Sequence, residues 1–295
     1  MVLIVFIVLA VFILMRLTAG DPARMKAPVF ASDEILQSYR EQFGTDRPLT
    51  TQLWDFVEGI PSGDFGVSFR YQEPVFSLIW QRVPETALLA LTALTIALFF
   101  ALTIGIASAR WPDSLIDRFG LALSTFGQSA PTFWVGLMLV LIFSVNLGWF
   151  PAVGFTGWKS LVLPAIAVAL AVMPADLRVV RASMMDTLHH DHVRTARAFG
   201  ISESRITLLY ALRNAALPLV TVIGIDLGYL LGGTIVIEVV FNYPGVGQLA
   251  IDSVNSRDYP LIQAITILTA LVFVFVNLGI DLLYMVLDPR IRIEA

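Results

Sequence analysis

Two aspartates interrupt otherwise uncharged, apolar runs of the sequence. Asp226 lies at the midpoint of residues 215–237, and Asp281 lies eight residues beyond the centre of residues 259–287. A carboxylate at the centre of a membrane span costs about 2.5–3.5 kcal/mol on insertion scales, so Asp226 is expected to face protein or water. It either attracts a cationic group there or is held between helices. Asp281 can reach interfacial water or an arginine, which favours a structural role.

The only three histidines of the sequence form a cluster whose residue types could suit a metal. His189, His190 and His192 surround Asp191, and imidazole and carboxylate groups are common ligands of transition metals. A polar face on a solvated helix explains the same pattern, and we favour it. We therefore predict no metal site.

The sequence lacks the motifs of several kinds of catalysis. The chain has no cysteine, which excludes disulfides, thiol catalysis and iron–sulfur sites. It has no Gly-x-x-x-x-Gly-Lys-Ser/Thr motif with which a P-loop binds ATP phosphates. Neither Asp226 nor Asp281 lies in a Gly-x-Gly-Asp sequence, which argues against an intramembrane aspartyl protease. We predict that the chain is not an enzyme by itself.

The composition places the chain in a membrane. Of its 295 residues 57% are hydrophobic and 14% are charged, with a mean hydropathy of +0.78. Soluble domains carry about 45–50% apolar and about 25% charged residues. This imbalance excludes a disordered chain, a basic nucleic-acid binder and an ordinary soluble enzyme.

Six stretches suit membrane-spanning helices, each of which needs about 20 mostly apolar residues. They are residues 1–19, 86–109, 121–147, 160–175, 215–237 and 259–287. The fourth is short and is bounded by Pro174 and Asp176. Pro131 and Pro174 are expected to kink their helices. The predicted fold class is an all-α integral membrane protein with six transmembrane helices.

The first stretch resembles a signal peptide in length and position, but it lacks a basic start and an A-x-A cleavage site. We predict an uncleaved first helix. An ordered external segment follows, with helical periodicity at Ile35, Leu36, Tyr39 and Phe43. The predicted organisation is a first transmembrane helix at 1–19, the external segment at 20–82, a five-helix core at 83–288 with a cytoplasmic loop at 176–214, and a tail at 289–295.

The arginines of the short loops predict the orientation, because positive residues near span ends stay in the cytoplasm. Ten lie on one side, at Arg110, Arg118, Arg178, Arg181, Arg194, Arg197, Arg205, Arg213, Arg290 and Arg292. Only Lys159 and Arg257 lie in short loops on the other side. Both termini and the 176–214 loop are therefore predicted to be cytoplasmic.

The 176–214 loop is too long to be a simple connection. Apolar residues recur with helical spacing up to Phe199, and Gly200 then suits a helix stop in the left-handed conformation. Ser202 suits an N-cap, with Glu203 in the first turn of a second amphipathic helix. Two interpretations remain open, a helix pair on the membrane surface and a docking element for a soluble partner.

Residues 194–200, Arg-Thr-Ala-Arg-Ala-Phe-Gly, resemble the cytoplasmic "EAA" loop of bacterial ABC importer permeases, in the form of the dipeptide/oligopeptide/nickel branch. Arg194, Thr195 and Ala196 fall on the E-A-A positions, and Gly200 falls on the glycine of that loop. The acidic position is therefore an arginine in this chain. Leu217-Pro218 resembles the closing Leu-Pro of the branch.

The resemblance covers nearly the whole chain. Further matching segments are 17–22, 43–49, 63–68, 82–86, 131–134, 147–151, 238–247, 258–260, 281–284 and 288–290. Their order and spacing together are specific. The chain thus resembles a B-type permease subunit of that family, with the fold of a type I ABC importer transmembrane domain.

The resemblance implies partners and a mechanism. A second, similar permease would complete a heterodimer in the lipid of the bacterial cytoplasmic (inner) membrane. Two cytoplasmic ATPase domains would hold ATP and Mg²⁺, while this chain would bind no cofactor and no nucleic acid. An external solute-binding protein would deliver a peptide, a dipeptide or an oligopeptide, to the external segment and the loop between the last two spans.

The resemblance also assigns roles to residues. The ATPase-coupling residues would be Val193, Arg194, Thr195, Ala196, Arg197, Phe199 and Gly200, within a loop at 186–200. The arginines would pair with ATPase carboxylates, and Val193, Ala196 and Phe199 would pack into the ATPase groove. Asp226, attracting a peptide amino terminus, and Tyr229 would line the pathway. Phe241, Tyr243, Pro244 and Gly245 would form an external gate or contact the binding protein.

The alternative function is an ion-gradient-driven secondary transporter of a small solute. Such a transporter is expected to show paired repeats or more buried ionisable groups than one deep charge. The sequence leaves the substrate open among dipeptides, oligopeptides, nickel chelates and other small solutes.

Overall fold

The computed structural model describes every residue except 1, 19–20, 22, 25–26, 29 and 288–295. The predicted tail at 289–295, with Arg290 and Arg292, lies outside the described residues, as does the side chain of Asp281. The described part is helical, apart from one isolated β-bridge between Val67 and Pro74. It divides into two compact units, residues 1–86 with 244–274 and residues 87–243 with 275–295.

The first unit contains the segment at 20–82 that the sequence predicts to be external. Its elements are α1 (Val2–Thr18), α3 (Asp33–Phe43), α4 (Leu49–Gly59), the short 3₁₀ helix η1 (Ile60–Ser62), the start of α5 (Val75–Arg110), α12 (Val246–Asn255) and the start of α13 (Tyr259–Leu287). The predicted helix around Ile35 is confirmed as α3. Ser32 caps its start, where the hydroxyl accepts a hydrogen bond from the N–H of Ile35, and Gly44 with φ +65° follows its end.

A buried carboxylate fixes the loop that precedes α5. Asp258 is fully buried and accepts hydrogen bonds from the Ser68 hydroxyl and from the backbone N–H groups of Phe69 and Arg70. Three donors compensate the burial of its charge. The loop carrying Phe69 is therefore held against the start of α13.

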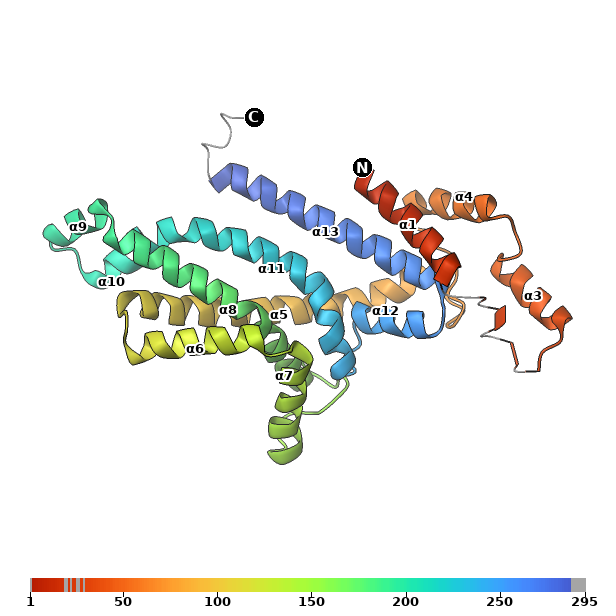
Figure 1. Ribbon diagram of the computed structural model, residues 1–295, viewed down its shortest axis with the longest axis horizontal. Coiled ribbons are helices and arrows are strands. Elements are labelled where there is room, and N and C mark those ends of the chain that lie inside the picture. Colours follow the sequence, from red (N-terminus) through yellow and green to blue (C-terminus); the bar gives the residue numbers. More distant parts are fainter. Residues whose placement is uncertain (1, 19–20, 22, 25–26, 29, 288–295) are drawn as a thin grey trace. The chain divides into compact units, whose positions relative to one another are not determined.

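The second unit is built around one long helix, α8 (Lys159–His189). The other elements are α6 (Leu115–Ser129), α7 (Thr132–Leu139), the π-helical η2 (Val140–Asn146), α9 (Asp191–Ala198), α10 (Glu203–Arg205), the π-helical η3 (Ile206–Ala211) and α11 (Leu212–Val240), with the remainder of α5 and α13. Helix α8 packs against α6, α7 and α11 (Figure 1). Its small and aliphatic residues, such as Ala165, Val168 and Leu177, form much of the core.

Three helices are long and apolar enough to cross a membrane, Val75–Arg110, Lys159–His189 and Tyr259–Ile280. Two bent pairs, Leu115–Ser129 with Thr132–Asn146 and Pro218–Leu230 with Gly232–Val240, raise the number to as many as five among the described residues. Helix α1 has 17 residues, fewer than the roughly 20 that a span needs. The helical membrane fold is confirmed, and the count of six spans stays a prediction.

The sequence predictions at two prolines, Pro131 and Pro174, have different outcomes in the structure. Pro131 lies between α6 and the α7–η2 segment, which are bent by 108°, so the predicted span 121–147 is not one straight helix (Figure 1). The fourth span was expected to end near Pro174 and Asp176, but α8 continues through both to His189. In a membrane the backbone stays helical unless other groups satisfy it, and neighbouring helices allow an internal proline.

Close approach and an ion pair join α6 to α8. A Cβ at Gly127 would lie 2.6 Å from Cγ of Pro174 and 2.9 Å from the carbonyl oxygen of Leu170. That carbonyl is the one to which Pro174, with no N–H, cannot donate. At the other end of α6, Arg181 donates to both oxygens of the buried Asp117, at 2.6 and 2.9 Å. The Ser124 hydroxyl donates to the carbonyl of Pro174 between them.

The Gly127 contact predicts the effect of one methyl group. Gly127→Ala should lower stability by about 1–3 kcal/mol, because the new methyl meets backbone and a proline ring that cannot rotate away. Gly279→Ala is the matched control, since no atom lies within 4 Å of a Cβ there and alanine favours a helix. Thermal unfolding of both variants in detergent measures the difference. Equal melting temperatures would show that α6 and α8 do not need this approach.

Candidate functional site

The segment that follows α8 forms a short helix between two turns. His190 is extended (φ −67°, ψ 152°), α9 spans Asp191–Ala198, and Gly200 has φ +74°. The N–H groups of Gly200 and Ile201 donate to the carbonyls of Arg197 and Ala196, as expected for a left-handed glycine stop. The predicted glycine turn is thus confirmed, but the helix before it is broken at His190.

Ser202 also adopts the backbone conformation of an N-cap (φ −63°, ψ 142°), although its side chain makes no capping hydrogen bond. Helix α10 and the π-helical η3 continue from it toward α11. Residues 190–205 thus comprise α9, the turn at Gly200 and the three-residue α10. We call them the coupling segment because they contain the residues predicted to couple the chain to ATPases.

The coupling segment buries one face of α9 and exposes the other. Val193 and Ala196 are buried with Met184, Ile206 and Ala211 in one apolar cluster. We expected Val193, Ala196 and Phe199 to pack into a partner. The i, i+3 spacing places Val193 and Ala196 on one face of α9, and in this conformation that face lies against their own chain. That the three residues pack into a partner stays a prediction. Phe199 is 82% exposed.

The arginines of the coupling segment differ in availability. Arg197 donates to Glu203 at 2.7 and 3.4 Å, and this hydrogen bond holds the pKa of Glu203 below its usual value. Among the described residues Arg194 forms one ion pair, with Asp191 at 3.5 Å, and its side chain is 75% exposed. Thr195 donates its hydroxyl to the carbonyl of Asp191. The Arg194 guanidinium is therefore more accessible than that of Arg197, which is 42% exposed, and the Phe199 ring is accessible as well.

The histidines beside this segment make local contacts. Nδ1 of His189 lies 2.6 Å from the carbonyl oxygen of Met185, and Nε2 of His190 lies 3.5 Å from Asp186. Among the described residues, no three His, Cys, Asp or Glu side chains are grouped as metal ligands.

Asp226 on α11 is buried, and sequence reasoning missed its neighbour. Its carboxyl faces that of Asp176 on α8, which is completely buried. Neither oxygen of Asp176 nor Oδ2 of Asp226 receives a hydrogen bond from the described residues. Two ionised carboxylates in such surroundings repel, so this pair favours a proton or a cationic group between them.

Tyr229 lies in a different environment from Asp226. Its side chain is half exposed, and its ring covers Gly233 one turn later, where a Cβ would lie 2.7 Å from Cε1. The structure therefore brings Asp226 together with Asp176 and leaves Tyr229 at the surface of the described chain.

The aromatic residues after α11 belong to the core. Phe241 and Tyr243 are buried, with the Tyr243 ring edge-on to Phe155 at 5.3 Å. The carbonyl of Phe241 accepts the N–H of Gly154 at 2.7 Å. Neither side chain reaches the surface in this conformation, and the role of Phe241 and Tyr243 as an external gate or a binding-protein contact stays a prediction. Pro244 is half-buried, and Gly245 is buried at the start of α12.

Nearly the whole chain is similar to known permease proteins. Residues 101–293 match the family described as "Binding-protein-dependent transport system inner membrane component", and residues 1–92 match the N-terminal region of such membrane components. The glutathione transport system permease protein GsiC of Salmonella typhimurium is 42% identical over 98% of this chain and 94% of its own length. The GsiC protein of Escherichia coli K12 is 42% identical over 96% and 92%.

Solved structures support the fold. A chain of the MetNI methionine ABC transporter in an inward-facing conformation aligns with a TM-score of 0.61. The two are 16% identical over 72% of this chain and 96% of that chain. A second crystal form of the same transporter gives a TM-score of 0.59. The chain belongs to the inner membrane permease components of binding-protein-dependent ABC importers.

Proposed function

We propose that this chain is one of two similar permease subunits that move peptides across the bacterial cytoplasmic membrane. Relatives named for glutathione transport support a peptide-like substrate, since glutathione is a tripeptide. Two ATPase domains hold ATP and Mg²⁺ on the cytoplasmic side, where both termini of this chain lie. The external binding protein docks on the first unit. This chain binds no cofactor and catalyses no reaction by itself.

The observation that carries the proposal is that the coupling segment exposes Phe199 and Arg194 while its opposite face is packed against the rest of the chain. A partner that contacts Phe199 and Arg194 grips a helix whose other face is packed in the chain. Force on α9 passes to α8 through this packing, and from α8 to α6 through the Arg181–Asp117 pair. Closure of the ATPases would therefore rock these helices as a body between inward- and outward-facing states.

The coupling residues divide by role in this proposal. Phe199 and Arg194 meet the ATPase, Val193 and Ala196 fix α9 to the chain, and Gly200 sets the turn. Arg197 and Thr195 stabilise the segment through Glu203 and Asp191. Interface energy concentrates in a few aromatic and arginine side chains, which favours Phe199 and Arg194 as the main contacts.

The first prediction concerns the accessible groups. Phe199→Ala and Arg194→Glu should each lower ATP-driven uptake about tenfold or more, because each removes a docking contact worth ~1.4 kcal/mol or more. Arg118→Glu, which makes the same charge change on the exposed surface of α6, is the control. Uptake and ATPase activity are measured in proteoliposomes containing the complete importer. Normal uptake in both variants would remove the coupling role.

A second prediction concerns the turn. Gly200→Val should uncouple ATP hydrolysis from uptake, because a β-branched residue is strained at φ +74°. Gly200→Asn should retain coupling, since asparagine adopts this conformation at little cost and no atom lies within 4 Å of the added Cβ. The ratio of peptide transported to ATP hydrolysed is the measurement. If both variants kept the same ratio, the turn geometry would be unimportant.

The buried carboxyl pair suits recognition of a cationic group in the pathway. Asp226 and Asp176 would offer their carboxylates to a peptide ammonium when α8 and α11 separate during transport. Tyr229 would line the pathway nearby. Pro244 and Gly245 would belong to the external gate, with Phe241 and Tyr243 as buried supports.

Asp226→Asn therefore should reduce the preference of the importer for peptides with a free amino terminus over N-acetylated peptides. Asp252→Asn on α12, which also removes one carboxylate, is the control. Competition uptake with paired free and acetylated peptides gives the ratio. Unchanged uptake and selectivity in Asp226→Asn would exclude the pathway role.

The rival function, a secondary transporter, makes a distinct prediction for the same preparation. It requires that this chain take up solute in an ion gradient without the ATPases. Reconstitution with and without the ATPases, at constant ion gradient, separates the two functions.

A further inference from the structure

The external segment is acidic. Residues 20–82 contain nine carboxylates and six basic side chains. Charge of one sign on an accessible surface attracts a partner of the opposite sign and raises its association rate. A protein that docks on this segment is therefore favoured when it presents basic residues.

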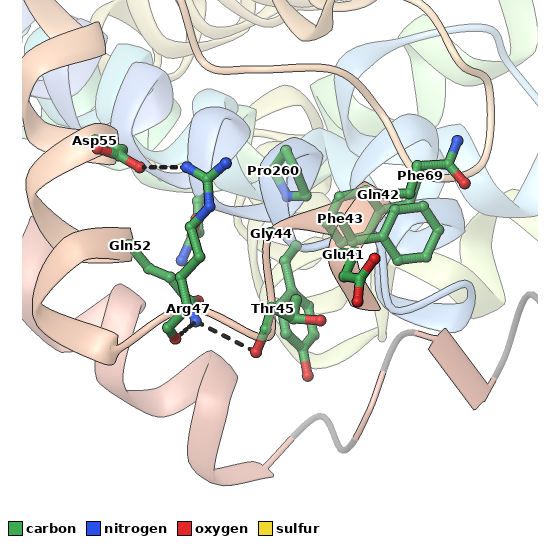
Figure 2. Close-up of a pocket in the computed structure, with 12 residues that line it drawn as sticks. Glu41, Gln42, Phe43, Gly44, Thr45, Arg47, Gln52, Asp55, Phe69 and Pro260 are labelled. Atoms are coloured by element: carbon green, nitrogen blue, oxygen red, sulfur yellow. Dashed lines mark hydrogen bonds and ion pairs between the residues drawn. The ribbon is translucent and has the colours of Figure 1, made fainter. Parts of the chain in front are cut away.

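A cavity of about 300 Å³ lies in the first unit, between the end of α3, the start of α4 and the start of α13 (Figure 2). Exposed charged groups line it, namely Glu41, Arg47 and Asp55. Less exposed aromatic rings line it as well, namely Phe43, Phe69 and Tyr259. The rings of Phe43 and Phe69 are stacked, with centroids 4.1 Å apart and planes 19° apart.

Hydrogen bonds fix the walls of this cavity in advance. Nε2 of Gln52 donates to the carbonyl of Arg47 at 2.7 Å, which joins α4 to the turn after α3 (Figure 2). Gly44 makes that turn with φ +65°. Phe69 lies in the loop that Asp258 holds through three hydrogen bonds. A ligand would thus meet a site that needs little ordering on binding.

The charges of the cavity are not fully compensated. Arg47 contacts Asp55 at 3.4 Å, with the side chains 58% and 53% exposed, and an exposed pair of this kind contributes little stability. Glu41 accepts one long hydrogen bond from Gln37, at 3.4 Å, and forms no ion pair within the described residues. An incoming cation would form an ion pair with Glu41 and would compete with Arg47 for the carboxylate of Asp55.

We propose that this cavity receives one lysine or arginine side chain of the external binding protein. Glu41 and Asp55 supply the counter-charges, and the Phe43–Phe69 stack supplies aromatic surface for the stem and the cation. The inference rests on the proposed function in so far as a binding protein docks on the first unit. It adds which pocket is used and which chemistry is recognised.

The test measures the affinity of the cognate binding protein for the complete importer in lipid nanodiscs, at low and high salt. Glu41→Lys should raise the Kd about tenfold, because a like charge then lines the cavity. Glu41→Gln, which keeps the shape, should raise the Kd by less and weaken its salt dependence. Glu58→Lys makes the same charge change on the exposed surface of α4, outside the cavity, and should change the Kd less than twofold.

Rescue identifies the occupant. Each surface lysine and arginine of the binding protein is changed to glutamate in turn, and one such change should restore the affinity that Glu41→Lys loses. The proposal is overturned if Glu41→Lys and Glu58→Lys act alike, or if no single reversal rescues. It is also overturned if a free basic peptide binds the importer in a Glu41-dependent manner without the binding protein.

These outcomes are separable from failure of the proposed function. Basal ATPase activity and assembly of each variant are measured alongside, so that a misfolded variant is recognised. If uptake depends on the binding protein but is unchanged by substitution of Glu41, the proposed role of the cavity is refuted and the proposed function is not. Uptake that needs neither binding protein nor ATPases would refute the proposed function.

Discussion

The buried carboxylate of Asp117 ties α6 to the central helix of the second unit, α8. An acid that is almost completely buried requires compensation, and Arg181 supplies two hydrogen bonds to it. This pair fixes the rotation of α8 against α6, while Gly127 fixes their separation near the other end of α6. Because α8 also packs on α7 and α11 and leads into α9, this contact links α6 to the other helices around α8.

Features set by neighbouring residues could be predicted from the sequence. The left-handed turn at Gly200, the helix α3 and the bend at Pro131 each depend on a few nearby residues. The family could also be recognised, because its motifs occur in order along the chain. Such features can be predicted from neighbouring residues even when the tertiary contacts are unknown.

Features set by tertiary contacts could not be predicted. Arg181 looked like a loop arginine, yet it pairs with an acid 64 residues away. Helical spacing predicted that Val193 and Ala196 share a face with each other, but it did not say whether a partner or the same chain covers that face. The burial of Phe241 and Tyr243 was missed for the same reason. Asp226 was found because one charge in an apolar run is visible, whereas Asp176 lay beyond the run that we assigned to the fourth span.

The π-helical turn η3 affects the number of residues between Gly200 and Pro218, and thus how this stretch aligns with the sequences of relatives. A π-helical turn contains about one residue more than an α-helical turn, and one residue corresponds to about 100° of rotation in an α-helix. Residues of α10 and α11 that share a face are therefore spaced differently from those of an uninterrupted helix. A relative with one residue fewer between Gly200 and Pro218 would keep the same three-dimensional alignment if its helix were α throughout. A one-residue gap in an alignment at this point would then reflect a π-helical turn in one protein and an α-helical turn in the other, with the same tertiary contacts in both.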